Sequence, residues 1–327
     1  MKKTICFAAM SACIAFSACE EKAVEAVPVG NDGQKFTLNV NVQNPDVKST
    51  VNSDGNSIGN LELLVFDANG ELEDYSFQNG TVWRGELSCT KGRKKVVALV
   101  NTPFRFNKVA RFSDLSSMRA DLLDNTMTTC VLEGMLEVDV TNSQTLEVAV
   151  KRQVSKIIVE EIKLAFALDH MKSKTVNANA IYLINVPGDR AFFSDAAPTK
   201  WYNQLKATET TAEILYDDLR QIALTEDSPI LLDHSFYTYP NPYTTDSQEA
   251  TWSERPTRLV LELKINSVKS YYPVTLPTLM PNHRYRVSLT ITRPGSSSPD
   301  HPVDKYVIAP TIKVEPWTEG ESRNEVI

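Results

Sequence analysis

The sequence predicts an all-β, mainly antiparallel protein, built as two tandem β-sandwich domains with a few short helices. Apolar and polar residues alternate in many short segments, the pattern of strands with one face in a core and one in water. Turn-forming residues separate these segments, and helical spacing is rare. A chain of 327 residues is long enough for two such sandwiches.

The N-terminal domain is expected to cover residues 35–150. Its first strand, Lys35–Val42, alternates over four apolar positions. Leu61–Phe66 follows as a second strand, and the unbroken apolar run Val96–Val100 is typical of a strand buried on both faces. Leucine and methionine at helical spacing predict a short helix over Ser113–Leu123. The apolar face of the first strand consists of Phe36, Leu38, Val40 and Val42.

The C-terminal domain is expected to cover residues 151–327. Leu259–Ile265 and Tyr285–Ile291 each alternate over four apolar positions and predict strands. A helix is expected within the stretch from Trp201 to Leu224. A final strand lies between two prolines, and because proline cannot donate to a β-ladder, that strand should lie at a sheet edge or end there. The prolines are Pro310 and Pro316.

Residues 1–18 have the pattern of a lipoprotein signal peptide. Two lysines precede the apolar run Thr4–Phe16, which is too short to span a bilayer. Two small residues then precede Cys19, whose thiol would take a diacylglycerol; the alternative is a plain signal peptide cleaved nearby. Residues 19–34 would form a flexible tether. Its acidic start resembles the signal that sends lipoproteins to the outer face of the outer membrane in Bacteroides-type bacteria.

Composition and motifs argue against several classes of function. A net charge of −7 does not favour nucleic acid as a partner. Motifs of serine hydrolases, zinc proteases and nucleotide-binding proteins are absent from the sequence, so no enzymatic activity, metal or cofactor is expected. Cys89 and Cys130 are the cysteines of the folded part, and a disulfide or two buried free thiols are both open.

Aromatic residues are dense around residues 236–252, with prolines between them. Exposed rings there could stack on sugars, which makes a surface glycan-binding lipoprotein the alternative function. The other explanation is a proline-fixed loop held by buried rings. The candidate glycan contacts are Tyr237, Tyr239, Tyr243 and Trp252.

An ordered set of short segments resembles the fimbrillins of Bacteroides-type bacteria, the subunits of type V pili. The segments span most of residues 35–320, and the resemblance is more specific in the second domain. They are Ile58–Gly70, Phe236–Asn241, Pro256–Val260, Tyr271–Val274, Asn282–Val287, Thr290–Ser296 and Val314–Trp317.

The resemblance implies a structural subunit of a cell-surface fimbria, anchored in the outer membrane through lipid on Cys19. In this family a trypsin-like surface protease cuts after the first strand. The C-terminal segment of another fimbrial subunit then fills the groove by strand addition. The removable strand here would be Lys35–Val42. The candidate donor residues are Ile308, Ile312 and Val314, and a fixed edge strand of their own domain is the equal alternative.

Lys48 is the basic residue of the loop between the first two strands. The family's processing site is typically an arginine, so two possibilities stay open. The protease could have broader specificity, or the subunit could remain uncut, as expected for the anchor at the base of a fimbria. Of the stalk, anchor and tip roles, the strand-like C-terminal segment slightly favours the stalk.

Overall fold

The computed structural model describes five stretches of the chain. The chain divides into two units, Met1–Gln34 and Lys35–Ile327, and nearly all described residues belong to the second. The predicted signal peptide, Cys19, most of the tether and Lys48 lie outside the described residues. The described stretches are 33–43, 57–126, 128–205, 214–246 and 252–317.

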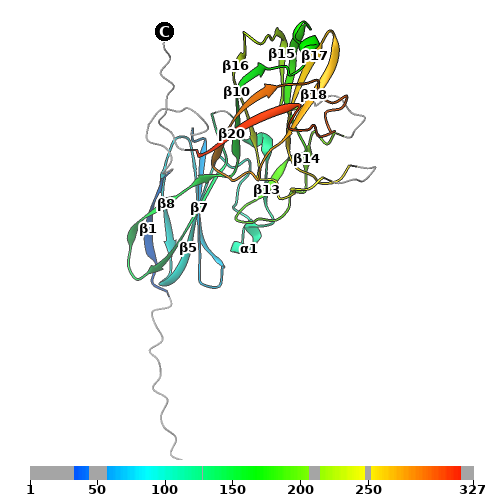
Figure 1. Cartoon of the computed structure of the whole chain (residues 1–327). Coiled ribbons are helices and arrows are strands. Elements are labelled where there is room, and N and C mark those ends of the chain that lie inside the picture. The colour runs from blue at the N-terminus through cyan, green and yellow to red at the C-terminus, as the bar shows by residue number, and fades with distance from the viewer. Residues whose placement is uncertain (1–32, 44–56, 127, 206–213, 247–251, 318–327) are drawn as a thin grey trace, which may run out of the picture. The chain divides into compact units, whose positions relative to one another are not determined.

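Two sheets are built from residues before position 153 (Figure 1). The three-stranded sheet has the order β4-β1-β8, and the five-stranded sheet has the order β3-β2-β5-β7-β9. The first consists of β4 (Arg84–Cys89), β1 (Phe36–Gln43) and β8 (Gln144–Ala149). The second consists of β3 (Leu72–Asn79), β2 (Asn60–Phe66), β5 (Gly92–Val100), β7 (Leu132–Val140) and β9 (Lys151–Arg152).

Two four-stranded sheets follow, with the orders β16-β10-β19-β20 and β15-β11-β17-β18 (Figure 1). The mostly antiparallel pairing confirms the all-β sandwich fold. The first sheet consists of β16 (Ile230–Thr238), β10 (Ser155–Leu164), β19 (His283–Ile291) and β20 (Ile308–Pro316). The second consists of β15 (Tyr216–Ala223), β11 (Val176–Ile184), β17 (Arg258–Ile265) and β18 (Val268–Thr275).

Short elements complete the fold. Two helices and one 3₁₀ turn are described: α1 (Phe112–Leu115), α2 (Asp169–Lys172) and η1 (Leu122–Asp124). Two small ladders are also present. One pairs β12 (Val186–Pro187) with β14 (Trp201–Tyr202), and the other pairs β6 (Arg119–Asp121) with β13 (Asp189–Ala191).

The five-stranded sheet carries apolar side chains on both faces. In β5, Val96, Ala98 and Val100 join the core that also contains β1, whereas Val97 and Leu99 join a second cluster. Phe192, from the second half of the chain, packs edge-on against Phe106 in that cluster, with ring centroids 5.1 Å apart. The prediction that Val96–Val100 is buried on both faces is therefore confirmed.

The helix expected over Ser113–Leu123 is much shorter than predicted, and the helix expected within Trp201–Leu224 is absent from the residues described there, which leave out 206–213. Within Ser113–Leu123, helix α1 ends at Leu115, and Arg119–Asp121 pairs with β13 instead. Within Trp201–Leu224, the described residues form β14 and β15. In both places, pairing with a strand distant in the sequence outweighs a local helical pattern, since propensity is a weak preference.

The boundary between the two proposed domains stays a prediction. Strands of the first two sheets end by Arg152, and those of the last two begin at Ser155. The β6–β13 ladder and the Phe192 ring nevertheless connect the two halves. Cys89 and Cys130 are both buried and form no disulfide with each other, which decides between the two alternatives that the sequence left open.

Candidate functional site

Strand β1 is the central strand of its sheet. It pairs antiparallel with β4 from Phe36 to Asn41 and parallel with β8 from Leu38 to Gln43. Its backbone groups therefore bond to two neighbours, and its removal would leave a gap with an unpaired strand edge on each side.

The apolar face of β1 points into the core. Leu38, Val40 and Val42 are buried, and Phe36 is partly buried against the same core. Thr37 and Asn39, on the other face, are exposed. The alternation in the sequence thus places the predicted removable face against the core, so that loss of β1 would expose a row of apolar pockets.

Backbone contacts fix both ends of β1. The Val42 N–H donates to the Trp83 oxygen at 2.7 Å, and the Val150 N–H donates to the Gln43 oxygen at 2.8 Å. At the other end, the Thr37 N–H donates to Ser143 Oγ at 3.0 Å. These contacts involve the backbone of β1, so another strand lying in the same register could replace them.

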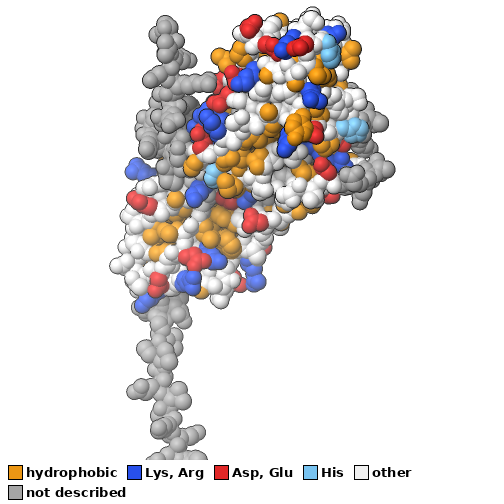
Figure 2. Space-filling model, viewed as in Figure 1, with side chains coloured by type: hydrophobic (Ala, Val, Ile, Leu, Met, Phe, Trp, Pro, Cys, Tyr) orange, Lys and Arg blue, Asp and Glu red, His pale blue; other side chains and the backbone are white. Residues whose placement is uncertain are grey.

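Strand β20 lies at the edge of its own sheet, as its two prolines predict, but it begins at Ile308, so Pro310 lies within the strand and does not precede it. It pairs antiparallel with β19 along its whole length, from His283 opposite Pro316 to Ile291 opposite Ile308. The three candidate donor residues differ in environment: Ile308 is buried, Ile312 is partly buried, and the Val314 side chain is 46% exposed. On the face that contains β20, hydrophobic side chains lie in several groups among charged and polar ones (Figure 2).

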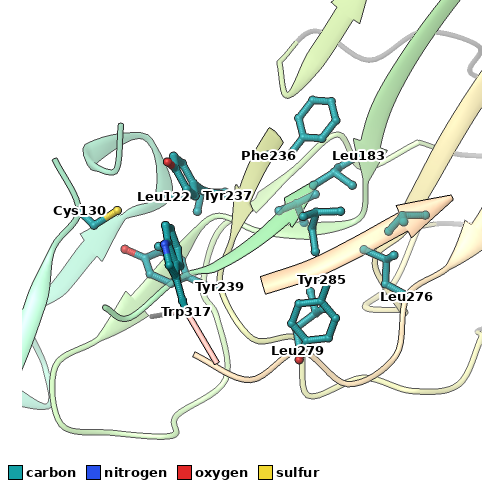
Figure 3. Close-up of a cluster of buried hydrophobic side chains, with 14 of the residues drawn as sticks. Leu122, Cys130, Leu183, Phe236, Tyr237, Tyr239, Leu276, Leu279, Tyr285 and Trp317 are labelled. Carbon is teal, nitrogen blue, oxygen red and sulfur yellow. The ribbon is translucent and has the colours of Figure 1, made fainter. Parts of the chain in front are cut away.

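Trp317, directly after β20, is fully buried. Its ring stacks on that of Tyr237 (Figure 3), with centroids 5.5 Å apart and planes inclined by 12°. The Arg152 guanidinium lies 4.4 Å from the centroid of the Trp317 ring. The Trp317 N–H donates to the Asn282 oxygen at 2.9 Å, and Arg152 Nη1 donates to the Trp317 oxygen at 3.2 Å. We call the surroundings formed by Arg152, Tyr237 and Asn282 the Trp317 seat.

The candidate glycan contacts fall into two groups. Tyr237 and Tyr239 are buried, and the Tyr239 hydroxyl accepts from Asn125 Nδ2 at 3.1 Å. These two rings therefore belong to the core, which does not fit a sugar surface. Tyr243 and Trp252 are partly buried and pack around Trp201, with centroids 5.7 Å and 5.4 Å from it at steep ring angles.

The inclined rings do not present one flat platform. The indole N–H of Trp252 also donates to Asn185 Oδ1 at 3.0 Å, so the one hydrogen-bond donor of this ring is used inside the protein. The arrangement resembles a loop held by packed rings more than a stacking surface for sugars.

The described stretches contain neither a helix that could cross a bilayer nor a metal-binding cluster. None of the helices there is long and apolar enough to cross a bilayer. Among the same residues, no cluster of three or more His, Cys, Asp or Glu side chains could hold a metal ion. Trp317 ends the last of the fimbrillin-like segments, but the sequence assigns it no role. No local pattern predicts the Trp317 seat, because the residues that form it lie far apart in the chain.

Comparison with known proteins places the fold. No family model matches the chain, and no curated protein matches it. Among solved structures, a candidate cell adhesion protein of Bacteroides eggerthii aligns with a TM-score of 0.68 and 18% identity, covering 87% of this chain and 97% of that one.

Two fimbrial proteins of Porphyromonas gingivalis also align. The fimbrilin FimA gives a TM-score of 0.64 at 16% identity, covering 88% of this chain and 99% of that one. The tip fimbrial protein Mfa3, with a C-terminal truncation, gives 0.54 at 15% identity, covering 87% and 100%. The resemblance to Bacteroides-type fimbrillins is thus confirmed in the three-dimensional fold.

Proposed function

We propose that this protein is a structural subunit of a cell-surface fimbria, assembled by strand exchange at the place of β1. The observation that carries the proposal is the position of β1: it is central in its sheet and its apolar face lies in the core. The loop that follows β1 in the sequence contains Lys48, where a trypsin-like protease could cut.

The comparisons support this proposal at the level of fold. Structures that align along most of their length include a fimbrilin, a tip fimbrial protein and a fimbrial assembly protein. A filament built from protein subunits needs no catalytic centre, so the proposed role is non-enzymatic. The proposal includes export as a lipoprotein, anchoring in the outer membrane through Cys19 and assembly with other fimbrial subunits.

The physical basis is ordinary strand addition. An incoming strand would restore hydrogen bonds to both β4 and β8, and its alternate side chains would fill the pockets of Leu38, Val40 and Val42. A shift by one residue would turn those side chains towards solvent, so the pockets also fix the register. Until it is filled, the gap exposes apolar surface and two unpaired strand edges, so it readily binds another strand.

The test uses the full chain with the recognition sequence of a site-specific protease inserted at Lys48. After cutting, a labelled peptide of residues 35–43 is added in excess, and bound label is measured after gel filtration. We expect the peptide to replace the resident strand in the cut protein and to be excluded from the uncut protein. Equal label on both, or on neither, would contradict the proposal.

A matched control peptide carries Val40→Asp. It keeps length and backbone, but places a charge in a fully buried pocket, so we expect no stable incorporation. Incorporation of this peptide to the same extent would mean that the label reports nonspecific adhesion.

A further inference from the structure

We infer that the place of β1 accepts a strand from a different protein, and that β20 of this chain stays in its own sheet. The inference rests on the proposed function, because it names the kind of partner that the exchange site takes. It follows from the backbone requirements of the two positions and from the contacts that hold β20.

The place of β1 requires an unbroken series of amide donors. Since β4 lies on one side and β8 on the other, each N–H of a central strand points at one neighbour or the other. Apolar side chains are needed at four alternate positions, those of Phe36, Leu38, Val40 and Val42. A suitable occupant is therefore an extended, proline-free segment with this alternation.

The β20 segment does not meet the amide requirement. When Ile308 is placed at the position of Phe36, Pro310 falls on that of Leu38 and leaves an acceptor without its donor. Moving the register by two residues takes Pro310 to the position of Phe36, but brings Pro316 to that of Val42. Each of these in-phase registers therefore places a proline within the exchange site.

The same prolines suit β20 in its present position. The Trp317 N–H donates to the Asn282 oxygen, and the Thr292 N–H donates to the Val307 oxygen. The backbone groups of the odd-numbered residues from 307 to 317 therefore form the hydrogen bonds to β19. Because the pattern alternates in an antiparallel ladder, the backbone nitrogens of Pro310 and Pro316 face away from β19, where no donor is required. Proline on the outer edge also blocks the addition of another strand there.

Contacts specific to this chain hold β20 in place. The Trp317 seat holds its C-terminal end, and buried Ile308 holds its start. Between them, Arg286 Nε donates to Glu315 Oε1 at 2.7 Å, and Arg286 Nη1 donates to Glu160 Oε1 at 2.9 Å. Release of β20 as a donor would break all these contacts and the ladder to β19.

Residues 318–327, which follow Trp317, do not have the pattern that the place of β1 requires either. Residues 318–327 contain Val326 and Ile327 as their large apolar residues and lack the alternation of β1. Strand exchange with this subunit therefore pairs its β1 place with a foreign strand, so the chain acts as an acceptor. This disfavours the stalk role, in which one subunit both accepts and donates.

The test uses the cut full chain described above with three labelled peptides. The first is residues 35–43, the second is residues 306–317, and the third is residues 306–317 with Pro310→Val. We expect the second to bind at least about tenfold more weakly than the first, because a buried acceptor stays unpaired, and the third to recover most of that loss.

The outcomes separate this inference from the proposed function. Binding of the 306–317 peptide within tenfold of the 35–43 peptide would overturn the inference and leave strand exchange intact. Failure of the 35–43 peptide to bind would overturn both. A second readout is assembly: the cut protein alone should give no SDS-resistant ladder, and a ladder formed from this chain alone would also overturn the inference.

Discussion

Strands β1 and β20 differ in their number of neighbouring strands, and under our proposal the strand with more neighbours is the one that is replaced. β1 has two neighbours and lies in the core, whereas β20 has one neighbour and an open edge. β1 is held by backbone ladders and aliphatic side chains, which any strand of the same pattern can supply. β20 is held by an indole, a guanidinium and an ion pair that belong to this chain.

The largest difference should appear when the Trp317 seat is emptied. We expect Trp317→Ala to lower the free energy of unfolding by about 3–5 kcal/mol, because a fully buried ring leaves a cavity between Arg152 and Tyr237. The control is Val314→Ala, which should change it by about 0.5 kcal/mol or less because that side chain is exposed. Denaturant unfolding measures both variants. Equal losses of the free energy of unfolding would mean that the Trp317 seat does not hold β20.

On the other strand, Leu38→Ala should lower the free energy of unfolding by about 2–5 kcal/mol, since Leu38 is fully buried in the core. The same change in the 35–43 peptide should weaken its uptake by the cut protein. Asn39→Ala, on the exposed face, serves as the control and should have little effect in either experiment. If Leu38→Ala lowered the stability of the protein but did not weaken uptake of the peptide, the Leu38 pocket would have no part in strand exchange.

Two proline variants test the assigned orientation of β20. Thr311→Pro should lower the free energy of unfolding by about 1–3 kcal/mol, because the amide of Thr311 faces Ser288 in the ladder with β19 and proline removes that donor. Pro310→Val should change the free energy of unfolding by about 0.5 kcal/mol or less, because position 310 faces outward. Similar effects of both variants in thermal or denaturant unfolding would contradict the assigned orientation of β20.

The smallest expected effect is a pH dependence of the free energy of unfolding that arises outside β1 and β20. Burial alone would raise the pKa of Asp189, but hydrogen bonds from Thr199 and Arg119 outweigh it and hold the pKa below its usual value. The folded state thus binds fewer protons at this carboxyl group. The Asp189 carboxylate therefore stabilises the folded state at a pH above its unfolded pKa of about 4. This stabilisation is lost as the pH falls through the lower pKa of the folded state.

Asp189→Asn removes this titration. We expect the free energy of unfolding to fall less between pH 7 and pH 3 in the variant than in the unaltered protein. The measurement is denaturant unfolding at both pH values. An identical fall would assign the acid sensitivity to other carboxyl groups.

Local patterns predicted the strands but not their partners. The alternation of Lys35–Val42 and the apolar run Val96–Val100 correspond to β1 and β5, because a strand's buried face is set by its own residues. The helix expected within Ser113–Leu123 is cut short because Arg119–Asp121 pairs with β13, about seventy residues away. Such pairing depends on the whole fold and has no local signal.

The candidate site shows the same limit. The sequence indicated which side chains of β1 face the core, but not that β8 would place β1 at the centre of a sheet. Likewise, Pro310 and Pro316 predicted an edge strand, but not that β20 would begin before Pro310, and the Trp317 seat could not be foreseen. Arg152, Tyr237 and Asn282 come from three separate parts of the chain.

Hydrogen exchange of the full chain before and after cutting at position 48 tests the central claim most directly. In the presence of excess unlabelled 35–43 peptide, the resident β1 amides should lose their protection after cutting, while the amides of β20 keep theirs. Unchanged protection of β1, or an equal loss in both strands, would contradict the claim that β1 is the replaceable strand of this fold.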